Sequence, residues 1–453
     1  MQKTIGNYRW TICALLFFAT TVNYLDRQVL SLLKPTLEDE FGWTNSDYAN
    51  IASVFQFVYA ISMLFAGRLI DKLGTKKGYA WAIIIWSLGA MMHAYSIPIG
   101  ETLTTALGLI GITVLPVSVI GFMVSRAVLG FGESGNFPAA IKATAEYFPK
   151  KERSFATGIF NSGTNVGAIL APLTVPWITV HYGWEAAFML IGAVGFFWLI
   201  FWYIYYDQPE LQKRISSEEL AYINSDRSEE VVIQTPEEEH VKWFRLLMYK
   251  QTWTFAIGKF LTDGVWWFFL FWLPAYLKDQ YGMTGTDIAL PLTVLYSMTM
   301  FGSIGGGWFP VYFINKGNSP YIGRMKAMLV IAVFPLVVLA AQPLGNISYW
   351  LPVVLIGIGA SAHQAWSANL YTTVSDMFPK KAVASVIGIG GMAGGMGGVI
   401  VNKVGGALFD YYKALGHIET GYTIMFSFCA IAYLLAWGVM KLLVPSHSKI
   451  KDV

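Results

Sequence analysis

Long apolar stretches separated by short polar connections dominate this chain. A helix that crosses a bilayer needs about 20 mostly apolar residues, and twelve segments of roughly that length can be traced. They are expected at residues 10–32, 48–70, 79–97, 117–140, 154–176, 186–206, 252–277, 287–314, 325–342, 348–375, 383–409 and 420–443. Because a bilayer offers no partners to free backbone groups, these segments are expected to be α-helices. The pattern predicts an all-α membrane protein with twelve transmembrane helices.

One charged stretch divides these segments six and six. Residues 207–250 are rich in charge and poor in aromatic residues, which predicts a cytoplasmic linker that is part helical and part disordered. The chain would then comprise a six-helix bundle at 1–206, the linker at 207–250 and a second six-helix bundle at 251–453. The Thr- and Leu-rich connection at 98–116 suggests no function.

Basic residues are distributed unevenly over the connections, and this predicts the orientation. With both termini in the cytoplasm, the short inner connections carry twelve basic residues and the outer ones carry three. The inner set is Lys72, Lys76, Lys77, Lys142, Lys150, Lys151, Arg153, Lys316, Arg324, Lys326, Lys380 and Lys381, and the outer set is Lys34, Lys278 and Lys413. Cytoplasmic loops carry such an excess in membrane proteins. We therefore expect a multi-pass protein of the cell inner (plasma) membrane with both termini cytoplasmic.

Composition excludes several classes of function. The chain is 55% hydrophobic and only 13% charged, against roughly 25% charged in soluble proteins. The net charge is +3 and the basic residues form no continuous stripe, so no nucleic-acid partner is expected. Cys13 and Cys429 both fall in apolar segments and are expected to be buried without a disulfide or a metal. The apolar stretch from residue 10 is followed by no small-residue cleavage site, which predicts a retained first span.

An internal repeat relates the two halves. The sequence EYFPKK at 146–151 recurs 230 residues later as DMFPKK at 376–381, and each copy is followed by a segment rich in small residues. Duplicated halves place a substrate site at their interface, near the middle of the bilayer. The glycine run Gly390–Gly398 lacks the strand and the Lys-Ser/Thr pair of a phosphate loop, so close helix packing is expected there.

The connection at 67–77 reads GRLIDKLGTKK and resembles the loop signature of the major facilitator superfamily at every defining position. Those positions are Gly67, Asp71, Lys72, Gly74, Lys76 and Lys77. The resemblance implies that this motif gates the inner side without touching the substrate. Gly67 is expected to permit close helix approach. The corresponding connection of the second half, 307–324, lacks the acid.

Further motifs narrow the resemblance. RAVLGFGE at 126–133 with Pro138, and NYLDR at 23–27, resemble the anion:cation symporters of this superfamily. Phe160–Gly163 (FNSG), KFLTD at 259–263 and FWLP at 271–274 resemble hexuronate transporters. The resemblance implies a monomer of two six-helix pseudo-repeats that takes up a small organic anion with protons, and a hexuronate is the suggested substrate.

Charged residues inside the spans are the first functional candidates, because each costs at least ~2.5 kcal/mol there. Adjacent residues point about 100° apart on a helix, so Asp26 and Arg27 cannot neutralise one another. We expect Arg27 to bind a substrate carboxylate with its bidentate fork and Asp26 to accept a proton. The alternative is that both form structural pairs with other helices.

Arg126 and Glu133 lie two turns apart on one face of the fourth span. We expect Glu133 to carry the coupled proton, with Arg126 as an electrostatic partner. Substrate bound at Arg27 would remove a cation from Glu133 and favour its protonation, provided that the two residues are close. The alternative is a fixed Arg126–Glu133 ion pair.

Several polar and aromatic residues are weaker candidates. His363 occupies the position equivalent to Glu133, and with Gln364 beside it His363 is expected to hydrogen-bond the substrate or to titrate; a packed, satisfied histidine is the alternative. Lys259 and Asp263 stand one turn apart and are interpreted as a structural ion pair. Hydroxyl recognition is assigned to Gln56, Tyr59, Asn161, Trp267, Trp366, Ser367 and Asn369.

The leading hypothesis is symport of a monovalent sugar acid with protons, with a hexuronate first and an aldonate such as galactonate second. An exporter or antiporter of the same fold is the second hypothesis, although the fifth span lacks the Gly-Pro pair typical of exporters. A transporter-like sensor would need an output domain, for which the linker is too short. No metal cluster, nucleophile–base pair or nucleotide motif is apparent, so we expect no enzyme, no metal and no cofactor, with the proton as coupling ion.

Overall fold

The computed structural model describes residues 6–108, 115–225, 243–446 and 450. Almost all of them lie in helices, and the described residues contain no β-strand. The first half of the chain comprises α1 (Tyr8–Phe41), α2 (Asn45–Leu73), α3 (Thr75–Met92), η1 (His93–Tyr95), α4 (Ser96–Gly108), α5 (Val117–Glu133), α6 (Asn136–Tyr147), α7 (Lys150–Tyr182) and α8 (Trp184–Tyr205). Within the predicted linker lie α9 (Ser217–Ile223) and α10 (Trp243–Leu246). Residues 226–242 of that linker are outside the described residues.

The second half repeats this succession of long helices. It comprises α11 (Lys250–Tyr281), η3 (Gly285–Ile288), α12 (Ala289–Gly305), α13 (Trp308–Asn315), α14 (Pro320–Val333), η4 (Phe334–Ala340), α15 (Ala341–Gly345), α16 (Trp350–Met377), α17 (Lys380–Ala414) and α18 (Ile418–Leu443). The exact ends of the predicted domains at 206 and 251 stay a prediction.

Ten spans in the described chain are long and apolar enough to cross a bilayer. Two further long helices, α1 and α16, complete the predicted twelve and are more polar, since α1 carries Asp26 and Arg27 and α16 carries His363 and Gln364. The third span is longer than predicted, because the helix continues from α3 through η1 and α4 and packs against α5. The first part of the stretch 98–116 is therefore helical, and residues 109–114 lie outside the described residues.

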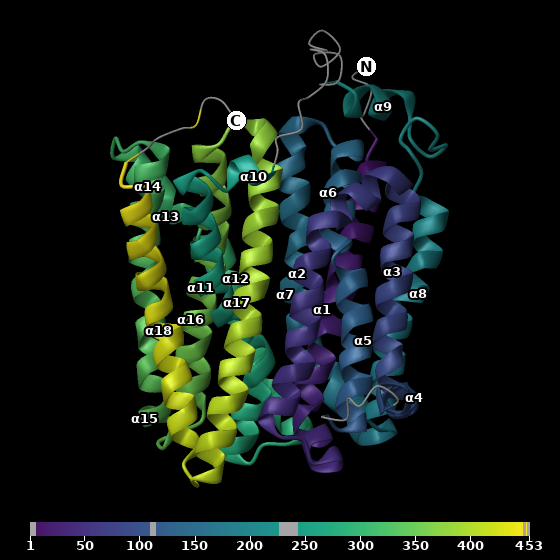
Figure 1. The fold of residues 1–453 in the computed structure, drawn as a ribbon. Coiled ribbons are helices and arrows are strands. Elements are labelled where there is room, and N and C mark those ends of the chain that lie inside the picture. Colours follow the sequence, from purple (N-terminus) through teal and green to yellow (C-terminus); the bar gives the residue numbers. More distant parts are fainter. Residues whose placement is uncertain (1–5, 109–114, 226–242, 447–449, 451–453) are drawn as a thin grey trace.

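The helices form two bundles side by side, as Figure 1 shows. We call the end at which α1 begins and α18 ends the terminal face, drawn at the top of the figure, and the other end the opposite face. The bundles meet where α2 packs on α17, α7 on α12 and α1 on α11. The interface between the halves is therefore built from helices at corresponding places in each half.

The repeat found in the sequence is also a repeat in structure. Phe148 and Phe378 each leave a helix in extended conformation, with φ/ψ of −123°/135° and −116°/152°. Pro149 and Pro379 follow at −63°/153° and −67°/153° and start the next helix. Proline is suited to this position because its φ is fixed near −65° and the first helical turn needs no N–H donor.

The glycine run of α17 packs closely against two helices, as predicted. A methyl group added at Gly395 would lie 2.6 Å from the Cβ of Ala60 on α2. A methyl group at Gly397 would collide with the backbone of Phe260 on α11. Such contacts are too short for any side chain, so glycine allows α17 to lie against both halves at once.

We expect Gly397→Ala to destabilise the fold by about 1–3 kcal/mol, the usual cost of overpacking. Gly438→Ala on α18 is the matched control, because a methyl group there meets no atom within 4 Å and alanine favours a helix over glycine. Thermal unfolding of both variants in detergent is the measurement. Equal melting temperatures would contradict the packing argument.

Candidate functional site

The fourth span is broken beside Glu133. Pro138 has no N–H and cannot donate a hydrogen bond to the carbonyl of Ser134, so the helix is interrupted there. α5 ends at Glu133 and α6 begins at Asn136. The break leaves the Glu133 side chain buried inside the bundle.

Glu133 forms an ion pair with Arg27 of α1. The Oε2 atom of Glu133 accepts hydrogen bonds from Nη2 of Arg27 at 2.6 Å and from Nε at 2.9 Å. The two side chains are 0% and 2% exposed. The proximity required by the coupling hypothesis is therefore present, and charge-assisted bonds of this length are among the strongest in proteins.

Arg126 lies next to this pair without joining it. Its Nη1 and Nη2 atoms donate to the backbone carbonyl of Arg27, each at 3.3 Å. The alternative of a fixed Arg126–Glu133 ion pair is thus wrong for this conformation. Arg126 instead holds the α1 backbone at the residue whose side chain binds Glu133.

Four aromatic rings surround the Arg27 guanidinium. Its Cζ atom lies 4.7 Å from the ring centre of Tyr24, 5.3 Å from Phe55, 4.9 Å from Tyr59 and 5.2 Å from Trp267. The electron-rich faces of such rings attract a cation. Since Trp267 belongs to α11 of the second half, the cation lies at the interface between the halves.

Asp26 is buried beside this pair, on another side of α1. It is 2% exposed, and neither carboxylate oxygen has a hydrogen-bond partner among the described residues. The structure therefore separates Asp26 from Arg27, as their adjacency on a helix requires. Its role in proton transfer stays a prediction.

Gln56 takes part in a buried chain of hydrogen bonds between the halves. Asn402 of α17 donates to the Oε1 atom of Gln56 at 2.9 Å and accepts from Nε1 of Trp272 at 2.7 Å. These contacts connect α2, α17 and α11 at the residue that follows Phe55 and stands three positions before Tyr59. Gln56 thus has a structural partner, and its contact with substrate stays a prediction.

The candidates on α16 point to packing roles. His363 is buried, with Nδ1 at 2.9 Å from the Tyr433 hydroxyl and its ring stacked on Trp266 at 5.2 Å. These contacts favour the packed alternative for His363. Asn369 donates to the carbonyl of Gly306 at 2.8 Å, beside the break between α12 and α13.

The remaining candidates are dispersed. Trp366 is fully buried, Gln364 and Ser367 are half-buried, and Asn161 is exposed on α7. Their contact with substrate stays a prediction.

The charged residues of the 67–77 motif lie at the terminal face. Asp71 pairs with Lys142 at 2.8 Å and Lys76 pairs with Asp207 at 3.0 Å, while Lys72 and Lys77 are exposed. Each of the two pairs stays within the first half of the chain and the start of the linker. Their gating role stays a prediction.

The two glycines of the motif differ in their role. Gly74 joins α2 to α3 with φ of 78°, a left-handed conformation that favours glycine. The prediction for Gly67 is wrong in this conformation, because a methyl group there would meet no atom within 4 Å.

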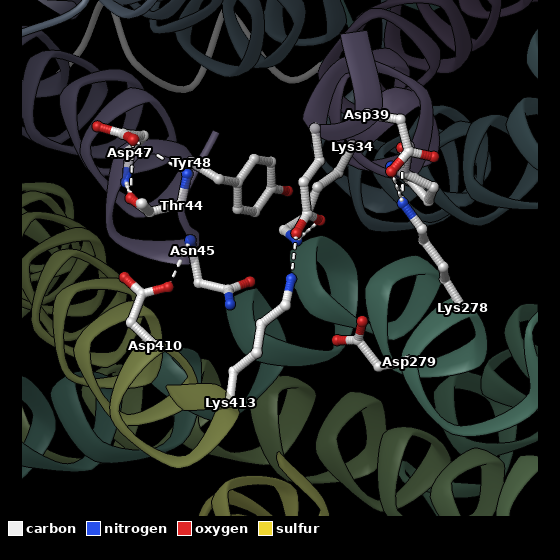
Figure 2. A network of polar contacts seen from close by, with 12 residues as sticks. Lys34, Asp39, Thr44, Asn45, Asp47, Tyr48, Lys278, Asp279, Asp410 and Lys413 are labelled. Carbon is white, nitrogen blue, oxygen red and sulfur yellow. Dashed lines mark hydrogen bonds and ion pairs between the residues drawn. The ribbon is translucent and has the colours of Figure 1, made fainter. Parts of the chain in front are cut away.

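A network of charges closes the opposite face, as Figure 2 shows. Lys278 of α11 pairs with Asp39 of α1 at 2.6 Å, and Lys413 of α17 pairs with Glu38 of α1 at 2.7 Å. Asp410 accepts hydrogen bonds from the backbone N–H groups at the first two residues of α2, both at 2.8 Å. We call Glu38, Asp39, Lys278, Asp410 and Lys413 the opposite-face network.

These contacts establish at which face ion pairs join the halves. Among the described residues, the two ion pairs that join the halves, at Lys278 and Lys413, both lie in the opposite-face network. Toward the terminal face, the pairs Asp71–Lys142 and Arg324–Asp376 each stay within one half. In the described part of the chain, the halves are thus joined by ion pairs at the opposite face and not at the terminal face.

The family model of the Major Facilitator Superfamily matches residues 16–402. This chain belongs to the major facilitator superfamily. It is 30% identical to the "Hexuronate transporter" of Escherichia coli (strain K12) over 445 residues, which cover 97% of this chain and 96% of the relative. It is also 30% identical to the "Galacturonate transporter" of Dickeya chrysanthemi over 358 residues, 79% of this chain and 96% of that protein.

Solved structures of this superfamily share the fold. A bacterial homologue of the human lysosomal transporter Spinster, in an inward-facing and unoccupied conformation, superposes with a TM-score of 0.69 at 16% identity, covering 98% of this chain and 100% of that one. The chain is therefore a multi-pass transporter of the major facilitator type, built from two six-helix pseudo-repeats.

Sequence reasoning missed some residues of this major facilitator site. Tyr24 stands in the NYLDR motif but was not proposed as a site residue. Phe55 carried no signal beyond its aromatic character, which is common in membrane helices. Asn402 stands inside an apolar helix, and a buried amide in a span was the signal that could have identified it.

Glu38 gives the opposite-face network a dependence on pH. It lies beyond the span expected at 10–32, near the end of α1. Burial alone would raise the pKa of Glu38, but the neighbouring Lys34 and Lys413 outweigh burial and lower the pKa to about 2. A carboxylate with a lowered pKa stabilises the folded state above its ordinary pKa, and this stabilisation is lost as pH falls toward the lowered value.

We expect Glu38→Gln to lower the melting temperature in detergent at pH 7. The corresponding loss in the free energy of unfolding should be no more than ~3 kcal/mol. The difference from the wild type should shrink as pH falls from about 4.5 toward 2. Glu40→Gln, which removes an exposed carboxylate two residues away, should show neither effect. A difference that stays constant between pH 7 and pH 3 would contradict the assignment.

Proposed function

We propose that this transporter imports a monovalent sugar acid together with protons, by alternating access, and that a hexuronate is its first candidate substrate. The observation that carries the proposal is the Arg27–Glu133 ion pair. It places a buried cation at the interface between the halves and gives that cation a counter-ion that can itself be protonated.

Competition for Arg27 couples the substrate to the proton. The guanidinium fork that now binds Glu133 is the group suited to a substrate carboxylate. A proton on Glu133 removes its negative charge, weakens its hold on Arg27 and frees the fork. Proton and substrate anion therefore bind together, because a proton on Glu133 frees Arg27 for the anion and an anion on Arg27 leaves Glu133 free to take up a proton.

Release of the substrate reverses this exchange of partners. When the substrate leaves, Arg27 regains Glu133 as a partner and the proton is lost, which leaves the site as the structure shows it. One proton per monoanion makes transport electroneutral. If Asp26 carries a second proton, the membrane potential adds ~2.3 kcal/mol per 100 mV.

The surroundings of Arg27 support a sugar acid. Tyr24 and Tyr59 combine a ring face with a hydroxyl group, so they can pack on a sugar and hydrogen-bond to it. The relatives named as hexuronate and galacturonate transporters support the same substrate class. Galactonate, an open-chain aldonate with the same single carboxylate, is the alternative.

The distribution of basic residues supports the direction of uptake. Twelve basic residues at or near the helix ends of the terminal face, against three near those of the opposite face, support a terminal face in the cytoplasm. The ion pairs that join the halves would then lie at the outer side of the inner membrane. A monomer suffices for this mechanism, because both halves of the site belong to one chain.

Uptake of labelled glucuronate into vesicles that hold the purified protein tests the proposal. We expect accumulation when an inward proton gradient is imposed, and a loss of at least ~100-fold in Arg27→Ala, since a lost charge-assisted fork costs several kcal/mol. Glu133→Gln should keep exchange of internal for external substrate but lose gradient-driven accumulation. Lys316→Gln, which removes a positive charge from the exposed surface, is the control and should transport normally.

Three other outcomes of the uptake experiment would change the proposal in different ways. Flux of galactonate without flux of glucuronate would keep the mechanism and replace the substrate. Accumulation by Glu133→Gln equal to the wild type would remove the proton from Glu133. Absence of flux for every sugar acid tested would overturn the proposed function.

A further inference from the structure

One face of α11 continues the Arg27 site toward the terminal face. Lys259, Asp263 and Trp267 follow one another at intervals of four residues, so they stand above one another on the helix. Trp267 contacts the Arg27 guanidinium. Four residues rise about 6 Å along a helix. The separation between Asp263 and Trp267 along the axis of α11 is therefore comparable to the length of a six-carbon sugar acid.

An ion pair and a contact with Tyr371 hold Asp263 and Lys259 in place. The Lys259 ammonium lies 2.5 Å from Oδ2 of Asp263, as predicted, and donates to the Tyr371 hydroxyl at 3.1 Å. It also lies 4.4 Å from the centre of the Tyr371 ring. The Lys259 and Asp263 side chains are only 5% and 15% exposed.

The second oxygen of Asp263 is unused. Oδ1 is buried and has no hydrogen-bond partner among the described residues. A buried acceptor without a partner costs free energy comparable to a lost hydrogen bond. A hydroxyl group supplied by a ligand would remove that cost.

Asp263 lies where three helices of the interface meet. Gly394 of α17 faces its carboxylate, while the adjoining Gly391 and Gly395 face Met63 and Ala60 of α2 in the other half. One turn further along α17, Gly398 faces Gln56 of α2 and Trp267 of α11, and Trp267 contacts the Arg27 guanidinium. The Lys259–Asp263 pair therefore lies at the same interface between the halves as the Arg27 site.

Stability alone gives little reason for such a pair. A buried ion pair gains little over well-packed apolar residues of similar volume, because both charges must be desolvated. Ionisable groups inside a membrane span are costly and are associated with function. A role in ligand binding would account for the presence of the Lys259–Asp263 pair.

We infer that Asp263, oriented by Lys259 and Tyr371, accepts hydrogen bonds from the hydroxyl groups of the sugar acid whose carboxylate is bound by Arg27. This inference rests on the proposed function and adds to it the residue that recognises the polyhydroxylated end of the substrate. Since Lys259 is already neutralised by Asp263, it offers no free positive charge to a second carboxylate. The site therefore selects polyhydroxylated monocarboxylates over dicarboxylates.

Calorimetric binding to the purified protein tests this assignment with two acids of similar size. D-glucuronate carries ring hydroxyl groups, and cyclohexanecarboxylate carries the same carboxylate without them. We expect Asp263→Asn to weaken glucuronate binding by about tenfold or more, the usual effect of losing a hydrogen bond to a charged group. Binding of cyclohexanecarboxylate, which depends on Arg27, should change less than twofold, as should both affinities in the control Asp287→Asn at an exposed position.

The double variant Lys259→Gln/Asp263→Asn separates recognition from charge balance. If Asp263 only neutralises Lys259, removing both charges restores glucuronate affinity, and that result would overturn the inference. If Asp263 accepts substrate hydroxyls, the double variant binds cyclohexanecarboxylate normally and glucuronate as weakly as the single variant. Equal weakening of both acids in Asp263→Asn would also overturn the inference, whereas a wild type that binds no sugar acid would overturn the proposed function itself.

Discussion

The interaction on which this structure depends is the ion pair between Arg27 and Glu133, fully buried in the middle of a membrane protein. Each charge alone would be costly in a bilayer, and removing either partner leaves the other uncompensated. The pair is nevertheless incomplete as a structural device, because a single oxygen of Glu133 receives both donors of Arg27. A carboxylate that accepted one hydrogen bond with each oxygen would fit the guanidinium better. A substrate carboxylate bound in this way can therefore compete with Glu133 for Arg27.

The rest of the fold positions this pair and makes it movable. The helix break beside Pro138 brings Glu133 into the interior, and Arg126 holds the α1 backbone at Arg27. Glycines of α17 bring the second half close enough for Trp267 to cover the guanidinium. At the opposite face the ion pairs of Lys278 and Lys413 join the halves. These two contacts are polar and lie at the end of the molecule, so they can be exchanged without disturbing the packing inside each half.

Sequence reasoning succeeded where a physical constraint acts along the chain. The spans follow from the thickness of the bilayer, and the packing of the Gly390–Gly398 run follows from its lack of side chains. It left alternatives open where two partners compete in space: Glu133 could pair with Arg126 on its own helix face or lie close to Arg27 of another helix, and only the structure shows that Arg27 binds the carboxylate. Gly67 was wrongly expected at a close helix contact, because the motif does not show whether a neighbouring helix reaches that position. Periodicity also could not show that α4 prolongs the third span, or that Asn369 binds a backbone carbonyl.

The central claim is that substrate and Glu133 compete for Arg27, and proton uptake on binding tests it most directly. Glucuronate is added to the detergent-solubilised protein in weakly buffered solution, and the change in pH is followed with an indicator dye. The account predicts that the wild type takes up a proton as glucuronate binds and that Glu133→Gln binds glucuronate with that uptake lost. Binding by the wild type without any proton uptake, or equal uptake by Glu133→Gln, would contradict it.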